Sequence, residues 1–128
     1  MRVLIADDQP QVRSALRLLL KQEPGLTVVG EAGDGELALA LAAEAQPDLV
    51  LLDWELPDQG PSGASRIAQH RLLPALRERC PSLKVVALSG RPEARQAALD
   101  AGVDAFVSKG DPPERLLAAV DDCRSGQC

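Results

Sequence analysis

Short apolar runs alternate with longer segments of helical spacing along the whole chain. The third apolar run, Leu49–Leu52, ends directly on Asp53 and is typical of a buried strand that brings a carboxylate to the edge of a sheet. The second run, Leu26–Ala32, is more mixed and is expected at an edge of the sheet. The runs expected as strands are residues 1–6, 26–32, 49–53, 84–88 and 105–108.

The segments between these runs place apolar residues on one side of a helix. In the first segment Leu16 and Leu20 share a face, and Pro10 suits the first helical turn. Pro74 lies inside the third segment and is expected to kink the helix or restart it. Helices are expected over about 10–23, 35–46, 64–79, 91–101 and 112–124.

Five strands that alternate with five helices predict an α/β fold. This order favours a parallel sheet that helices cover on both faces, with right-handed crossovers between the strands. A chain of 128 residues suits one domain of ordinary size, so residues 1–128 are expected to form a single domain.

The charge balance and the apolar runs exclude some classes of function. The formal net charge is −5, which argues against direct binding of this domain to a nucleic-acid backbone. No apolar run approaches the length of a membrane span, and no signal-peptide pattern follows Met1. The three cysteines, Cys80, Cys123 and Cys128, do not have metal-ligand spacing, and their odd number fits reduced thiols. A cytoplasmic protein without a membrane segment is therefore expected.

Four of the five expected strands end in a polar functional group. The groups are Asp7 with Asp8, then Asp53, Ser89 and Lys109. Ligands of an open parallel sheet bind beyond the carboxyl ends of its strands, so these side chains are expected to share one site.

This set of groups suits phosphoryl transfer. Three neighbouring carboxylates repel one another and favour a hard cation such as Mg²⁺. Asp53 is then a candidate carboxylate nucleophile, Lys109 a second positive charge, and Ser89 a hydrogen-bond donor to a phosphoryl oxygen. No histidine base is required, and the one histidine, His70, is expected at the surface.

At this point the residues match a known family. The chain resembles the receiver domain of two-component response regulators along almost its whole length, through four motifs in the family's order. The motifs are Val3–Asp8, Pro47–Asp53 with Leu56-Pro57, Ala87–Gly90 and Ala101–Gly110. The resemblance implies the family's doubly wound, flavodoxin-like sheet of five parallel strands in the order 2-1-3-4-5.

The resemblance also implies a metal site and a phosphorylated residue. It implies that Asp53 is the phosphorylated aspartate and that Mg²⁺ is held by Asp7, Asp8, Asp53 and the backbone carbonyl of Glu55. Ser89 and Lys109 would contact the phosphoryl group. The donor would be a histidine kinase or a phosphotransfer protein, as in a phosphorelay. Such a domain is no enzyme for other substrates, because it catalyses only its own phosphorylation and dephosphorylation.

The resemblance further implies a switch. The aspartyl phosphate shifts an existing equilibrium between two conformations, in which Ser89 moves toward the phosphoryl group and Phe106 moves into the released space. An output protein or output domain reads the change. A phosphorylation-dependent homodimer is one form that this output can take.

The sequence departs from the family's pattern in three places. The segment from Asp53 to Ser89 is long, with extra residues at Asp58–Gly63 and about one more turn in the third helix, whereas the segment from Ser89 to Lys109 is slightly short. Gly110 stands where many relatives have proline, a pattern seen in members with a helix-turn-helix output domain. The chain is therefore expected to be a stand-alone receiver or a piece of a longer regulator.

Three other interpretations compete with a phosphorylated receiver. A pseudo-receiver would keep the fold as a protein-interaction module without being phosphorylated, but the full set of site residues argues against it. A Mg²⁺-dependent phosphohydrolase usually places its nucleophile after the first strand in an Asp-x-Asp pattern, which this chain lacks. A dinucleotide-binding domain would need a glycine-rich first loop, and here the loop is Ala6–Pro10.

Overall fold

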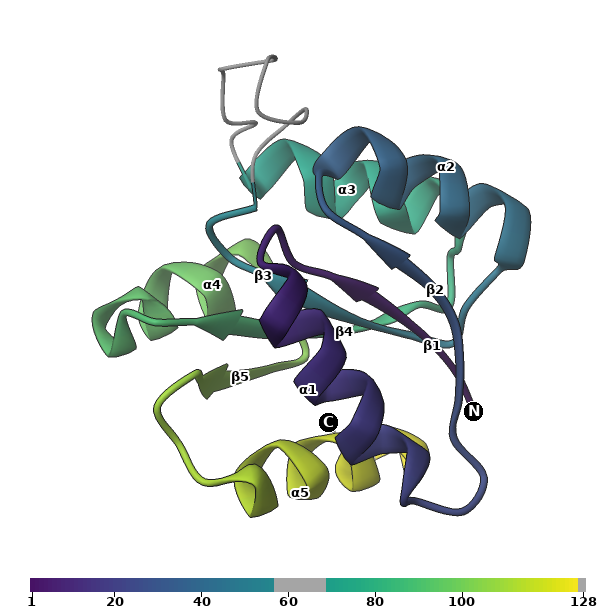
Figure 1. Cartoon of the computed structure of the whole chain (residues 1–128). Helices are drawn as coiled ribbons and strands as arrows, with labels where there is room; N and C mark the ends of the chain where they lie inside the picture. Colours follow the sequence, from purple (N-terminus) through teal and green to yellow (C-terminus); the bar gives the residue numbers. More distant parts are fainter. Residues whose placement is uncertain (57–68, 127–128) are drawn as a thin grey trace.

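The computed structural model describes residues 1–56 and 69–126 (Figure 1). Within these residues five strands and five α-helices alternate along the chain, as the sequence predicts. The strands are β1 (Arg2–Ala6), β2 (Thr27–Ala32), β3 (Leu49–Asp53), β4 (Lys84–Ser89) and β5 (Ala105–Ser108). The helices are α1 (Pro10–Lys21), α2 (Gly35–Ala45), α3 (Gln69–Arg79), α4 (Arg95–Ala101) and α5 (Pro113–Arg124).

The strands form one parallel sheet in the order β2-β1-β3-β4-β5, which confirms the predicted fold. The mixed second strand lies at one edge, as expected, and β5 lies at the other. Figure 1 shows α2 and α3 on one face of the sheet and α1 and α5 on the opposite face. This double winding requires a central strand that is apolar on both faces, and all five residues of β3 are buried.

Each face of the sheet has its own apolar core. Successive strand residues point to opposite faces, so Leu4 packs in the core under α2, α3 and α4 while Ile5 packs in the core under α1 and α5. Both side chains are fully buried. The two cores fix the sheet between the helices and thereby hold its carboxyl edge, where the polar groups lie.

Local sequence signals explain several helix ends. The Asp34 side chain accepts a hydrogen bond from the Leu37 N–H at 2.8 Å and caps α2. Pro10 is the first residue of α1, where its missing N–H costs nothing. Gly102 ends α4 with φ +105°, a conformation that favours glycine.

The helix α3 continues across Pro74, so the proline does not restart it. The buried side chains of Leu72, Leu73 and Leu76 pack against the sheet on both sides of the proline, which offsets the loss of one backbone hydrogen bond. The long loop expected at Asp58–Gly63 and the expected start of this helix lie outside the described residues. No helix in the described ranges combines the length and the apolar character that a membrane span needs.

Candidate functional site

The carboxyl ends of four strands bring the predicted site residues to one edge of the sheet. Backbone hydrogen bonds extend the sheet beyond the strand ends: Asp7 N–H donates to the Ala32 carbonyl at 2.9 Å, and Lys109 N–H donates to the Ser89 carbonyl at 2.8 Å. These bonds fix the main chain at the positions where the functional side chains begin. Asp7, Asp53 and Ser89 are all buried, at 0%, 2% and 0% exposure.

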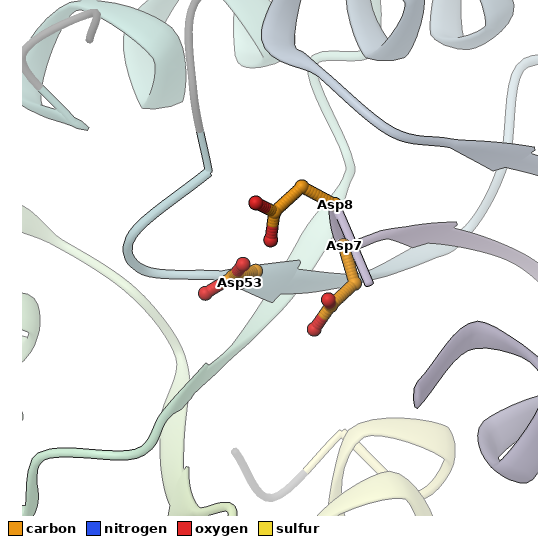
Figure 2. Close-up of side chains that lie close together, drawn as sticks. All are labelled: Asp7, Asp8 and Asp53. Atoms are coloured by element: carbon orange, nitrogen blue, oxygen red, sulfur yellow. The ribbon is translucent and has the colours of Figure 1, made fainter. Parts of the chain in front are cut away.

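Asp7, Asp8 and Asp53 form an acidic cluster. One carboxylate oxygen from each lies within 4.8 Å of the others, and Figure 2 shows the three side chains gathered at the ends of β1 and β3. The loop backbone orients two of them: Gln9 N–H donates to Asp7 Oδ1 at 2.9 Å, and Glu55 N–H donates to Asp53 Oδ1 at 3.0 Å. The sequence prediction that these acids meet is thus matched by the geometry.

Lys109 inserts its ammonium group between two of these acids. Its Nζ lies 2.8 Å from Asp7 Oδ2 and 3.4 Å from Asp53 Oδ1. Burial works to lower the pKa of Lys109, but hydrogen bonds and negative charges from Asp7 and Asp53 outweigh burial and raise it. Lys109 is therefore a permanent positive charge in the site at neutral pH.

The environment raises the pKa of Asp53 from its ordinary 3.8 to about 6. Burial is the largest cause, and the charge of Asp7 and a hydrogen bond with Asp8 act in the same direction. The Glu55 N–H and the charge of Lys109 oppose the increase. One lysine thus compensates only part of the cost of ionising Asp53, and a further cation would favour the ionised form.

The donor set fits a hard divalent cation. Oxygen atoms are the ligands that Mg²⁺ prefers. It takes one or two carboxylates directly and keeps several waters, through which a third carboxylate can act. Asp7 Oδ2 is buried, and Lys109 Nζ lies 2.8 Å from it. Glu55, whose backbone carbonyl is the expected fourth ligand, lies in the turn directly after β3.

Ser89 belongs to the same edge of the sheet but faces a different partner. Its Oγ lies 3.0 and 2.9 Å from the two carboxylate oxygens of Glu55, and it accepts the Arg91 N–H at 3.0 Å. Arg91 also approaches Glu55, with Nη2 3.4 Å from Oε2. The Ser89 hydroxyl is therefore engaged by Glu55 in this structure.

Phe106 lies on the edge strand β5, opposite Ala87 of β4. Its half-buried ring packs against the core under α2, α3 and α4. The ring is thus next to the strand that carries Ser89, as a switch role would require. The side chain of His70, expected at the surface, is outside what the structure describes.

The side chains of Arg13 and Glu55 make contacts at the site that were not predicted from the sequence. Arg13, on α1, donates from Nη1 to the backbone carbonyl of Asp7 at 2.7 Å and lies 3.7 Å from the Glu31 carboxylate. The Glu55 side chain pairs with Ser89. The spacing of Arg13 on the first helix places it near the end of β1, but only the three-dimensional structure identifies its partner.

A family model described as the response regulator receiver domain matches residues 3–121. The chain is 35% identical over 127 residues to the nitrate/nitrite response regulator protein NarL of Escherichia coli, a match that covers 98% of this chain and 55% of that protein. It is 36% identical over 121 residues to the transcriptional regulatory protein PdtaR of Mycobacterium tuberculosis, covering 94% of this chain and 55% of that protein. The chain thus spans about half the length of these relatives.

Solved structures give the same result. The isolated REC domain of RcsB from Salmonella enterica serovar Typhimurium, determined in the presence of phosphomimetic BeF3-, superposes with a TM-score of 0.83 at 26% identity, covering 99% of this chain and 90% of that one. A two-component response regulator of the LuxR family from Aurantimonas has a TM-score of 0.83 at 26% identity, covering 98% and 86%. By sequence and by fold, the chain belongs to the receiver domain family of two-component response regulators.

Proposed function

We propose that this domain is a phospho-accepting switch in which Asp53 takes a phosphoryl group from a histidine kinase or a phosphotransfer protein. The observation that carries the proposal is the acidic cluster of Asp7, Asp8 and Asp53 with the Lys109 ammonium between two of its members. A structural role alone does not account for three carboxylates that meet at a sheet edge, where their mutual repulsion and the burial of Asp7 and Asp53 are costly. Binding of a cation and a phosphoryl group does account for them.

The cation in this proposal is Mg²⁺. Asp7, Asp8, Asp53 and the backbone carbonyl of Glu55 would hold it, and the approach of one carboxylate oxygen from each acid to within 4.8 Å of the others supports this set. When bound, Mg²⁺ would neutralise charge on the phosphoryl oxygens.

Asp53, Lys109 and Ser89 would each have a different role in the phosphoryl transfer. A carboxylate oxygen of Asp53 forms a bond to phosphorus while the bond from phosphorus to the donor's imidazole nitrogen breaks, and the imidazole keeps the electron pair. Lys109, already 3.4 Å from Asp53, remains as a positive charge beside the new phosphoryl oxygens. Ser89 would donate its hydroxyl hydrogen to one of these oxygens. Hydrolysis of the acyl phosphate by water would return Asp53, so the chain turns over only its own phosphoryl group.

The output follows from a shift between two conformations. Ser89 would move toward the phosphorylated Asp53, and Phe106 on the neighbouring strand would move with it. The chain spans about half the length of its curated relatives, and among the similar solved structures is a DNA-binding response regulator of the LuxR family. We therefore propose that an output domain or a separate output protein reads this switch in the cytoplasm, directly or through a phosphorylation-dependent homodimer. The net charge of −5 argues against direct contact of this domain with nucleic acid.

Intact-protein mass spectrometry after incubation with acetyl phosphate tests the proposal. The wild type should gain one phosphoryl adduct in the presence of Mg²⁺ and none without it, and Asp53→Asn should gain none. Asp122→Asn, which removes an exposed carboxylate on α5, is the matched control and should label like the wild type. An adduct that persists in Asp53→Asn would contradict the assignment of Asp53.

The same experiment separates the proposal from its main alternative. A folded wild-type protein that never labels would indicate a pseudo-receiver, a protein-interaction module of the same fold that is not phosphorylated. Far-UV circular dichroism of each sample shows whether the protein tested is folded.

A further inference from the structure

The single hydrogen of the Ser89 hydroxyl is already donated to Glu55 before any phosphoryl group arrives. A serine hydroxyl has one hydrogen to donate. Both carboxylate oxygens of Glu55 lie within hydrogen-bond distance of Ser89 Oγ, at 3.0 and 2.9 Å, and Ser89 Oγ itself accepts the Arg91 N–H at 3.0 Å. Because Ser89 is 0% exposed, water does not supply a ready replacement for either partner.

We propose that Glu55 is a positioning residue that holds the Ser89 hydroxyl in the unphosphorylated arrangement. The proposal rests on the proposed function, since it assumes that a phosphoryl group on Asp53 needs the same hydroxyl hydrogen. The Glu55 carboxylate and the phosphoryl group are both anionic acceptors, and they compete for one donor. Formation of the signalling conformation therefore breaks the Ser89–Glu55 hydrogen bond, and the strength of this bond sets part of the equilibrium between the two states.

The main chain holds the competitor in place. Glu55 N–H donates to Asp53 Oδ1 at 3.0 Å, so the residue that binds Ser89 is tied to the predicted phosphorylation site. The side chain of Arg91 contributes less to the arrangement, because it is 61% exposed and lies 3.4 Å from Glu55. The charge of Glu55 is the feature to test, because a hydrogen bond to a carboxylate is stronger than one to a neutral amide.

Affinity for beryllofluoride in the presence of Mg²⁺ measures the equilibrium. Glu55→Gln keeps the shape and the acceptor oxygen but weakens the hydrogen bond, so it should bind beryllofluoride about fivefold more tightly than the wild type. The fluorescence of Trp54, the one tryptophan of the chain and the neighbour of Asp53, reports the titration. Glu44→Gln, which removes an exposed carboxylate near the far end of α2, should bind like the wild type.

Glu55→Gln also removes a negative charge near the anion site, and the effect of that charge on beryllofluoride affinity must be separated from the proposed competition for Ser89. Removing any nearby negative charge favours an anion, whatever Ser89 does. The Glu55→Gln change is therefore repeated in a Ser89→Ala background, as a double-mutant cycle. If Glu55 acts through Ser89, its effect on beryllofluoride affinity should largely vanish there. An equal effect in both backgrounds would overturn the inference.

The outcomes also separate a failure of the proposed role of Glu55 from a failure of the proposed function on which it rests. A folded wild type that binds no beryllofluoride with Mg²⁺ would overturn the proposed function, and the inference with it. A wild type that binds beryllofluoride while Glu55→Gln binds with unchanged affinity would overturn only the role of Glu55. Tighter binding by Glu55→Gln that depends on Ser89 supports both.

Discussion

Replacing Asp53 by asparagine should stabilise the folded domain when no divalent cation is present, although the same change should abolish phosphorylation. Asp53 is 2% exposed, and burial together with the charge of Asp7 raises its pKa to about 6. At neutral pH the carboxyl is therefore ionised in surroundings that favour its protonated form. Asparagine has nearly the same shape and still accepts the Glu55 N–H, but it carries no charge.

The size of the effect follows from the pKa. A carboxyl whose pKa rises from 3.8 to about 6 on folding makes its ionised form less stable in the folded protein by about 3 kcal/mol. A buried amide has a desolvation cost of its own, so the expected gain from Asp53→Asn is smaller, about 1–2 kcal/mol. For a domain of this size, that gain corresponds to a rise in melting temperature of roughly 4–10 °C.

The dependence on pH identifies the cause. Between about pH 4 and pH 6 the folded wild type binds more protons at Asp53 than the unfolded chain does, so this group lowers the free energy of unfolding as the pH rises through that window. Asp53→Asn lacks this contribution. The stability difference between variant and wild type should therefore be small near pH 4, grow up to about pH 6 and stay constant above it.

Urea denaturation followed by circular dichroism, in EDTA and at several pH values, measures these differences. Asp122→Asn is the control, and it should change the free energy of unfolding by only a few tenths of a kcal/mol because the side chain is exposed. Saturating Mg²⁺ should stabilise the wild type more than Asp53→Asn, so the difference in the free energy of unfolding between the two proteins should become smaller. An Asp53→Asn protein that is no more stable than the wild type in EDTA at pH 7 would refute the reasoning.

Two further changes test the surroundings of the site. Lys109→Ala should raise the pKa of Asp53 further, which carbon NMR of the carboxyl measures. The variant should still bind Mg²⁺, but its affinity for beryllofluoride should be about tenfold weaker. An unchanged affinity for beryllofluoride would remove Lys109 from the mechanism. Arg77→Ala removes hydrogen bonds of 2.7 and 2.8 Å that join α3 to Gly102 and Asp104, so urea denaturation should show a loss of about 1 kcal/mol, and no loss would mean that water replaces these bonds fully.

The sheet and the meeting of its polar groups could be predicted because both follow from simple patterns. The run Leu49–Leu52 is apolar at every position, which is typical of a strand with helices on both faces, and β3 is buried throughout. Once the strands are parallel, their carboxyl ends share an edge. Asp53 and Lys109 are then expected at one edge although they are far apart in the sequence, and the structure places Lys109 Nζ 3.4 Å from Asp53 Oδ1.

Side-chain partners could not be predicted in the same way. Glu55 was expected to supply its backbone carbonyl, and the hydrogen bond between its carboxylate and Ser89 was not predicted. Arg13 reaches the Asp7 carbonyl from the neighbouring helix. Each contact depends on rotamers and on the path of a loop, and neither leaves a periodic signal in the sequence. Pro74 is the converse case, because the burial of its leucine neighbours keeps α3 continuous across the proline.

Cation binding and phosphorylation should act on different groups at this edge, although Glu55 takes part in both, through its backbone carbonyl and through its side chain. The acidic cluster and Lys109 share contacts, so a cation there relieves the cost of ionised Asp53 directly. The Ser89 hydroxyl, by contrast, has hydrogen bonds to Glu55 and to the Arg91 N–H. If Glu55 holds Ser89 as proposed, Mg²⁺ alone should stabilise the domain without releasing the hydroxyl, since the cation offers it no competing acceptor. Only an anionic group on Asp53 offers the Ser89 hydroxyl a competing acceptor. At a constant Mg²⁺ concentration the domain would therefore keep the unphosphorylated arrangement until phosphorylation occurs.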